Sequence, residues 1–141
     1  MSSLTLAQAN QIITVALAKA REAGYKPLGI VVLDEGGALK AFAREDGASM
    51  LWFDIALGKA WAAVGMGTSS RALGERAKQN PNFFVSLAAT AHGKFLPQTG
   101  AIVIKNSAGE VIGAVGASGA TGDEDEAACI AGVTAAGLAY E

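Results

Sequence analysis

A single lysine within an apolar stretch is the first residue in this sequence that points to chemistry. Lys59 interrupts a run rich in Ala, Leu and Trp, inside a helix that the pattern predicts over residues 50–65. Burying an ammonium group without a partner costs free energy, so such a lysine either extends along its stem to solvent or pairs with a carboxylate. The sequence leaves both alternatives open. In the second, Lys59 and its partner form an acid–base pair.

A run of four carboxylates, Asp-Glu-Asp-Glu, begins the last predicted helix and supplies candidate partners. Thr121 and Glu124 have the spacing of a capping box, and acidic residues suit the positive end of a helix dipole. Capping therefore accounts for the first two carboxylates but requires neither Asp125 nor Glu126. We predict that Asp125 or Glu126 pairs with Lys59, which makes these three the candidate catalytic residues. The alternative is that all four carboxylates only cap and solvate the helix start.

Small residues precede the acidic run and suggest that something approaches the backbone closely. Gly113, Gly116 and Gly119 recur at every third position, a spacing that helix capping does not explain. We therefore place Gly116, Ser118 and Gly119 among the candidate ligand-binding residues. Ser118 does not have the Gly-x-Ser-x-Gly spacing of a nucleophile elbow. The only histidine, His92, is a further ligand candidate, with a structural role as its alternative.

These residues need a scaffold, and the hydrophobic pattern predicts an α+β fold. Apolar residues at helical spacing predict helices, and β-branched runs joined by glycine-containing turns predict two hairpins. The predicted helices cover residues 5–23, 50–65, 71–78 and 123–138, and the predicted strands cover residues 28–33, 38–44, 100–105 and 110–115. Residues 82–96 are undecided. Because hairpins pair antiparallel, we expect one antiparallel sheet flanked by helices, in a single domain over residues 1–141.

Composition argues against two classes of partner. The 141-residue chain is 51% hydrophobic, yet no apolar run approaches the ~20 residues of a membrane span. Its mean hydropathy of +0.33 is high, so we assign the surplus apolar surface to contacts between subunits and expect a homo-oligomer. A net charge of −2 with scattered basic residues argues against nucleic-acid binding.

Metal binding and secretion are also disfavoured by the sequence. The single cysteine, Cys129, excludes a cysteine-based zinc cluster, and the acidic run has no loop that would fold its carboxylates around one ion. We therefore predict no metal site. The first residues lack the pattern of a signal peptide, so a cytoplasmic location is expected.

Four motifs, in the same order, resemble the GlcG/HbpS family. They are Val32-Leu-Asp-Glu-Gly-Gly37, Phe42-Ala-Arg-Glu-Asp-Gly-Ala48, Asp54-Ile-Ala-Leu-Gly-Lys-Ala60 and the run from Val111 to Glu126. This family includes the carboxy-terminal domain of PduO-type proteins and is often labelled haem-binding or haem-degrading. The resemblance spans nearly the whole chain and implies a profilin-like α+β fold with a five-stranded antiparallel sheet. It also implies dimers that assemble further, often into octamers, and a small-molecule pocket at subunit interfaces, with haem or a related tetrapyrrole in some members.

The resemblance also indicates individual residues. The matching polar positions are Asp34, Arg44, Asp46, Lys59, Asp125 and Glu126. Arg44 joins Lys59 as a candidate ligand-binding residue, because a guanidinium can bind a carboxylate or propionate through two hydrogen bonds. A salt bridge is the alternative for Arg44, and turn or cap chemistry is the alternative for the first two aspartates. Haem is the cofactor that the resemblance implies, although the sequence departs from the family around residues 95–101.

The residues and the resemblance together predict a small-molecule-binding protein. Its ligand would be haem, another tetrapyrrole or a small organic acid, held in a pocket at a subunit interface. The alternative is a small cofactor-independent catabolic enzyme, an isomerase, lyase or hydrolase of an organic acid, that uses Lys59 with Asp125 or Glu126. A third hypothesis is a non-catalytic assembly protein whose acidic helix start only contacts other subunits.

Overall fold

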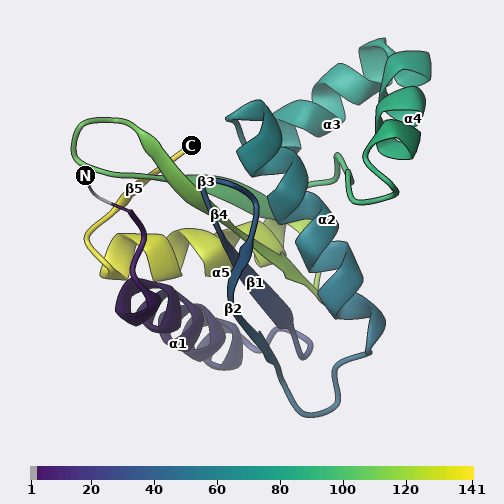
Figure 1. Ribbon diagram of the computed structural model, residues 1–141. Helices are drawn as coiled ribbons and strands as arrows, with labels where there is room; N and C mark the ends of the chain where they lie inside the picture. Colours follow the sequence, from purple (N-terminus) through teal and green to yellow (C-terminus); the bar gives the residue numbers. More distant parts are fainter. Residues whose placement is uncertain (1–2) are drawn as a thin grey trace.

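A five-stranded antiparallel sheet forms the centre of the molecule, with the strand order β2-β1-β4-β3-β5 (Figure 1). The computed structural model describes residues 3–141. The strands are β1 (Gly29–Asp34), β2 (Leu39–Arg44), β3 (Ala101–Lys105), β4 (Val111–Ser118) and β5 (Ala139–Tyr140). Both predicted hairpins are confirmed, β1 with β2 and β3 with β4, and β1 pairs with β4 to join them. The predicted α+β fold with a single antiparallel sheet is therefore confirmed.

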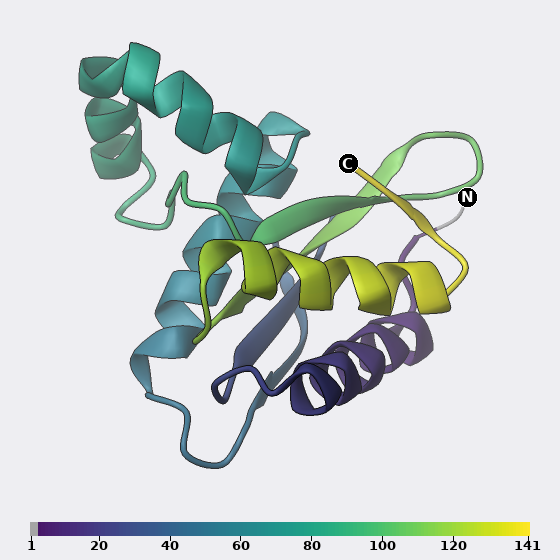
Figure 2. The same ribbon diagram turned by 180° about the vertical axis from the view of Figure 1, so that it is seen from behind.

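Helices cover both faces of this sheet. They are α1 (Leu6–Ala23), α2 (Leu51–Met66), α3 (Ser70–Gln79), α4 (Pro81–Thr90) and α5 (Gly122–Ala135). Helices α1 and α5 lie side by side on one face and α2 lies on the other, while α3 and α4 project away from the sheet beyond the end of α2 (Figures 1 and 2). None of the helices in residues 3–141 is both long and apolar enough to cross a membrane.

The central strands carry apolar side chains on both faces because both faces are covered. Ile30 and Val115 pack in the core beneath α1 and α5, whereas Val31 and Leu33 pack beneath α2. Successive residues of a strand point to opposite faces, so a strand buried on both sides has a continuous apolar run instead of an alternating one. This explains why the segment that forms β1 is almost entirely Val, Ile and Leu.

Local capping signals in the sequence correspond to real helix ends. The Thr5–Gln8 and Thr121–Glu124 capping boxes are both formed, at the starts of α1 and α5. Each box satisfies backbone N–H groups that would otherwise lack partners in the first turn. The undecided segment contains α4, which begins with Pro81 at its first turn, where a missing N–H costs nothing.

Two predicted boundaries are wrong, and both errors involve glycine. Strand β4 continues to Ser118 instead of ending near Val115, because Gly116 allows α2 to lie directly against the strand. A Cβ atom there would lie 2.6 Å from the carbonyl oxygen of Ala56. Helix α5 ends at Ala135 instead of Leu138, and the short strand β5 that follows was not predicted from the hydrophobic pattern.

Candidate ligand-binding site

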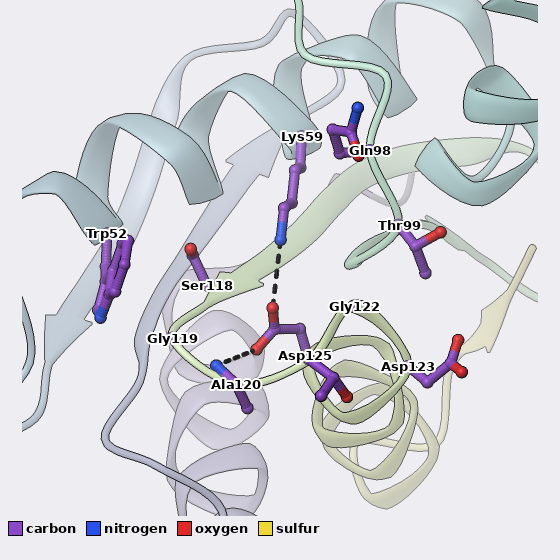
Figure 3. A pocket seen from close by; sticks show the side chains of 11 residues that line it. Trp52, Lys59, Gln98, Thr99, Ser118, Gly119, Ala120, Gly122, Asp123 and Asp125 are labelled. Atoms are coloured by element: carbon purple, nitrogen blue, oxygen red, sulfur yellow. Dashed lines mark hydrogen bonds and ion pairs between the residues drawn. The ribbon is translucent and has the colours of Figure 1, made fainter. Parts of the chain in front are cut away.

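A polar pocket of about 560 Å³ opens where α2, the end of β4 and the start of α5 meet (Figure 3). The segment just before β3 forms its remaining wall. The lining residues are Trp52, Lys59, Gln98, Thr99, Ser118, Gly119, Ala120, Thr121, Gly122, Asp123 and Asp125. The antiparallel pairing of β4 with β1 and β3 brings these distant segments to one end of the sheet, so the pocket is a product of the topology.

Lys59 reaches from α2 towards the start of α5 and is buried, with only 5% of its surface exposed. Its Nζ donates to the carbonyl oxygen of Ala117 at 3.0 Å and to Oδ2 of Asp125 at 3.2 Å (Figure 3). The ammonium group therefore does not extend to solvent. Of the two predicted carboxylate partners, Asp125 makes the contact and Glu126 does not.

Both carboxylate oxygens of Asp125 are engaged. Oδ2 accepts from Lys59, and Oδ1 accepts from the backbone N–H of Ala120 at 3.0 Å. Burial raises the pKa of Asp125, while the charge of Lys59 and the Ala120 N–H oppose the rise. Asp125 thus holds the ammonium group on one side and the loop between β4 and α5 on the other.

Ser118 presents the least satisfied polar group of the pocket. It is only 4% exposed, and its register opposite Gly29 directs it to the α2 side of the sheet. Within residues 3–141 the Ser118 hydroxyl makes no hydrogen bond, and it remains accessible from the pocket. Buried hydroxyls normally have a hydrogen-bond partner. A buried hydroxyl that lacks such a partner and faces a cavity indicates a place for a ligand or water.

Further hydrogen-bond donors surround Ser118. The ammonium of Lys59 has three N–H bonds and uses two of them within the described chain. The N–H groups of Gly122 and Asp123, in the first turn of α5, also have no partner among the described residues. The pocket thus has N–H groups that are free to donate, and the α5 N-terminus adds the positive end of its dipole.

Two other carboxylates of the acidic run contact a different partner, Arg71 of α3. The Arg71 Nη2 atom lies 3.0 Å from Oε1 of Glu126 and also contacts Asp123. Its Nε lies 3.2 Å from Oε2 of Glu126, so the guanidinium binds that carboxylate with two nitrogens. These hydrogen bonds raise the pKa of Arg71, and they tie α3 to the start of α5.

The remaining ligand candidates lie in four different places. Gly119 lines the pocket and has a φ of 136°, and a Cβ there would lie 2.2 Å from the carbonyl oxygen of Pro27. Gly116 is buried beneath α2 and does not line the pocket. Arg44, at the end of the edge strand β2, lines a separate depression with Arg21. His92 is exposed in the turn after α4 and lies outside the pocket.

The two aspartates that the resemblance added are also outside the pocket. Oδ1 of Asp34 accepts from the N–H groups of Gly36 and Ala38, which is the turn chemistry considered as its alternative. Asp46 is exposed and lies beside Arg44 in the second depression.

Among the lining residues that were not sequence candidates, three lie outside the segment that leads from β4 into α5. Gln98 and Thr99 belong to an irregular segment, and no pattern in the sequence indicates where such a segment runs. Trp52 did have a signal, because it precedes Lys59 by seven residues and therefore lies on the same face of α2.

The fold and this pocket define an α+β protein with one antiparallel sheet and a polar cavity at one end of that sheet. The family model described as "Haem degrading protein HbpS-like" matches residues 4–134. The chain therefore belongs to the HbpS-like family, as its four motifs predicted. The comparison with curated proteins gave no match.

Solved structures of similar proteins agree with this membership. The Klebsiella pneumoniae protein ORFY is 26% identical, with a TM-score of 0.88 over 97% of this chain and 92% of its own. A double mutant of Streptomyces reticuli HbpS is 26% identical, with a TM-score of 0.83 over 96% of this chain and 88% of its own. A PduOC–haem complex is 22% identical and shares the fold, with a TM-score of 0.87 over 98% of each chain.

The pocket does not fit an iron porphyrin held by an axial ligand. Haem iron is normally bound by His, Cys, Met or Tyr, and none of these lines the pocket in the described chain. Cys129 lies behind the pocket, fully buried, with its thiol 3.6 Å from the carbonyl oxygen of Gly100. No cluster of three or more potential metal-ligating side chains occurs in residues 3–141.

Proposed function

We propose that this protein binds a small organic acid in the pocket between α2, β4 and α5. The observation that carries the proposal is the buried hydroxyl of Ser118, which has no partner within the described chain and faces the pocket beside Lys59. A ligand that accepts hydrogen bonds would satisfy both groups at once. An ionised carboxylate has two oxygens that only accept hydrogen bonds, so it can satisfy both groups.

The electrostatics of the pocket support an anion. The charge of Lys59 is balanced by Asp125, so this pair is neutral as a unit but still has one N–H to donate. The free N–H groups of the first turn of α5 and the helix dipole favour negative charge nearby. Trp52 offers a flat apolar surface at the opposite side of the pocket, where the carbon skeleton of the acid can lie (Figure 3).

Calorimetric titration tests this proposal. The probes are acetate, succinate and benzoate, each beside its neutral amide, and haemin followed by its Soret band. At least one acid should bind the wild-type protein, and Ser118→Ala should weaken that acid about tenfold, the effect of one lost hydrogen bond to a charged group. Ser107→Ala, in the exposed turn between β3 and β4, is the matched control and should bind normally. Failure of every acid to bind would overturn the proposal, and tight haemin binding would then point to haem as the ligand.

A second candidate is catalysis by the Lys59–Asp125 pair on the same acid. It is favoured by a specific observation, the raised pKa of a buried carboxylate that contacts an ammonium beside a pocket. Such a pair can remove and return a proton next to a carboxylate, as isomerases and lyases require. The test is proton NMR in D₂O, in which the bound acid should lose its α-proton signal with wild-type protein and keep it with Lys59→Met. Equal exchange in both proteins would contradict this role.

Assembly into a homo-oligomer, with the pocket close to a subunit interface, stays a prediction of the sequence and the family resemblance. Exposed apolar side chains on α4, Phe83 and Val85, support it. Native mass spectrometry measures both the assembly and any retained ligand in one experiment. A monomer at micromolar concentration would contradict the predicted oligomer without affecting the acid-binding proposal.

A further inference from the structure

One carboxylate lies where the proposed pocket opens and a second lies near it, and both are unfavourable to an anionic ligand. Asp123 lines the pocket with a side chain that is 78% exposed, and Glu126 lies one helical turn from it. Like charges at such a rim slow the approach of an anion and weaken its binding. A pocket that binds an acid therefore needs a cation that offsets this pair.

Arg71 is the only basic residue in ion-pair contact with either carboxylate within residues 3–141. It comes from α3, outside the sheet, and its Nη2 contacts both side chains while Nε binds Glu126 a second time. With Arg71 the three side chains carry a net charge of −1, and without it the two carboxylates carry −2. The arginine does not line the pocket itself, so it acts on a ligand through Asp123.

We propose that Arg71 is a positioning residue that sets the charge preference of the pocket. Arg71 binds Asp123 and Glu126 and offsets part of their negative charge near the pocket opening. A carboxylate ligand can then reach Ser118 and Lys59. This inference rests on the proposed acid-binding function. It predicts that Arg71 affects charged ligands and leaves neutral ligands of the same shape unaffected.

The test compares an acid with its neutral amide in Arg71→Gln and wild-type proteins. Arg71→Gln should weaken binding of the acid about fivefold at low salt and leave the amide unchanged, because only the acid is repelled by the freed carboxylates. Adding Asp123→Asn to Arg71→Gln should restore most of the affinity for the acid. Arg76→Gln removes the same charge from an exposed residue of α3 that makes no ion pair within residues 3–141, and it should change the binding of neither ligand.

Three outcomes of this experiment would overturn the inference. Equal weakening of acid and amide would overturn the inference, because it would show that Arg71 only supports the shape of the pocket. Unchanged affinity for the acid in Arg71→Gln would also overturn it while leaving the acid-binding proposal intact. If the wild-type protein binds none of the acids, both proposals fail.

Discussion

Two groups of ion pairs meet at the start of α5, and they differ in burial. In the first, the side chains of Lys59 and Asp125 are 7% and 2% exposed. In the second, Arg71 is 47% exposed and its partners Asp123 and Glu126 are 78% and 16% exposed. Both groups draw on the same run of four acidic residues. Neighbouring positions in one helical turn thus have very different surroundings.

The difference shows that burial, more than the chemical type of the residues, decides what an ion pair does. A buried pair has lost its hydration, so each partner depends on the other, and removal of one leaves an uncompensated charge. An exposed pair remains solvated and is screened by salt, so it contributes little to stability. We therefore assign a structural role and a binding role to Lys59–Asp125, and mainly an electrostatic role to Arg71.

The largest effect is expected for Asp125→Asn. A carboxylate accepts from Lys59 and from the Ala120 N–H at the same time, whereas an amide has one acceptor and one donor, so one contact becomes repulsive. The free energy of unfolding should fall by about 3–5 kcal/mol, measured by urea denaturation. Asp123→Asn, two residues earlier on the exposed side, is the control and should change it by less than about 1 kcal/mol. Similar losses in the two variants would contradict the comparison.

A smaller effect is expected when the buried pair is replaced by apolar residues. The double variant Lys59→Met, Asp125→Leu removes both charges together and should lie within about 2 kcal/mol of the wild-type protein in urea denaturation. The residual loss comes from the Ala120 N–H and the Ala117 carbonyl, which lose their side-chain partners. Acid binding should nevertheless be abolished. A double variant as unstable as Asp125→Asn would show that the pair is needed for packing and not only for charge balance.

Arg71→Gln should have a still smaller effect on stability. Because the cluster is largely exposed, the expected loss is below about 1 kcal/mol at low salt and should vanish near 0.5 M NaCl. Urea denaturation at the two salt concentrations measures it. A loss of several kcal/mol that persists in salt would mean that Arg71 anchors α3 and α4 to the body of the protein, which would change the interpretation of its binding effects.

The smallest expected effect concerns Cys129, whose thiol should be unreactive in the folded protein. This thiol lies one turn after Asp125 on the buried side of α5, and burial, assisted by the charge of Asp125, raises its pKa. It should not react with a thiol reagent at pH 8 unless the protein is unfolded. The labelling rate should rise in Asp125→Asn and stay unchanged in Arg71→Gln. Rapid labelling of the wild-type protein would contradict the tight packing behind the pocket.

Much of the fold was predictable because its signals are local. The capping boxes at Thr5 and Thr121, the two hairpin turns and the β-branched runs each depend on residues close together in the chain. The ends of β4 and α5 were less predictable. Gly116 was predicted to bind a ligand, whereas it permits contact with a helix some sixty positions earlier in the chain, and no local pattern distinguishes these roles.

The candidate site was predictable in its residue types but not in its pairing. Lys59 and the acidic run are both unusual in the sequence. A lysine among apolar residues needs an explanation, and so do two carboxylates beyond a capping box. Which carboxylate meets Lys59 was not predictable, because Asp125 and Glu126 are adjacent and differ only by about 100° around the helix axis. The role of Arg71 was likewise not visible, and the spacing of Trp52 from Lys59 was the signal that the sequence offered for Trp52.

The sequence by itself determined most of the helices and strands, the antiparallel pairing within the two hairpins and a short set of polar residues that are too costly to bury alone. The tertiary structure decided which of these residues meet. The face of α5 that packs on β4 buries Asp125 against Lys59 and leaves Asp123 exposed at the pocket opening. Side-chain pairing of this kind depends on the rotation and position of a packed helix, which are set by contacts across the whole core and not by neighbours in the chain.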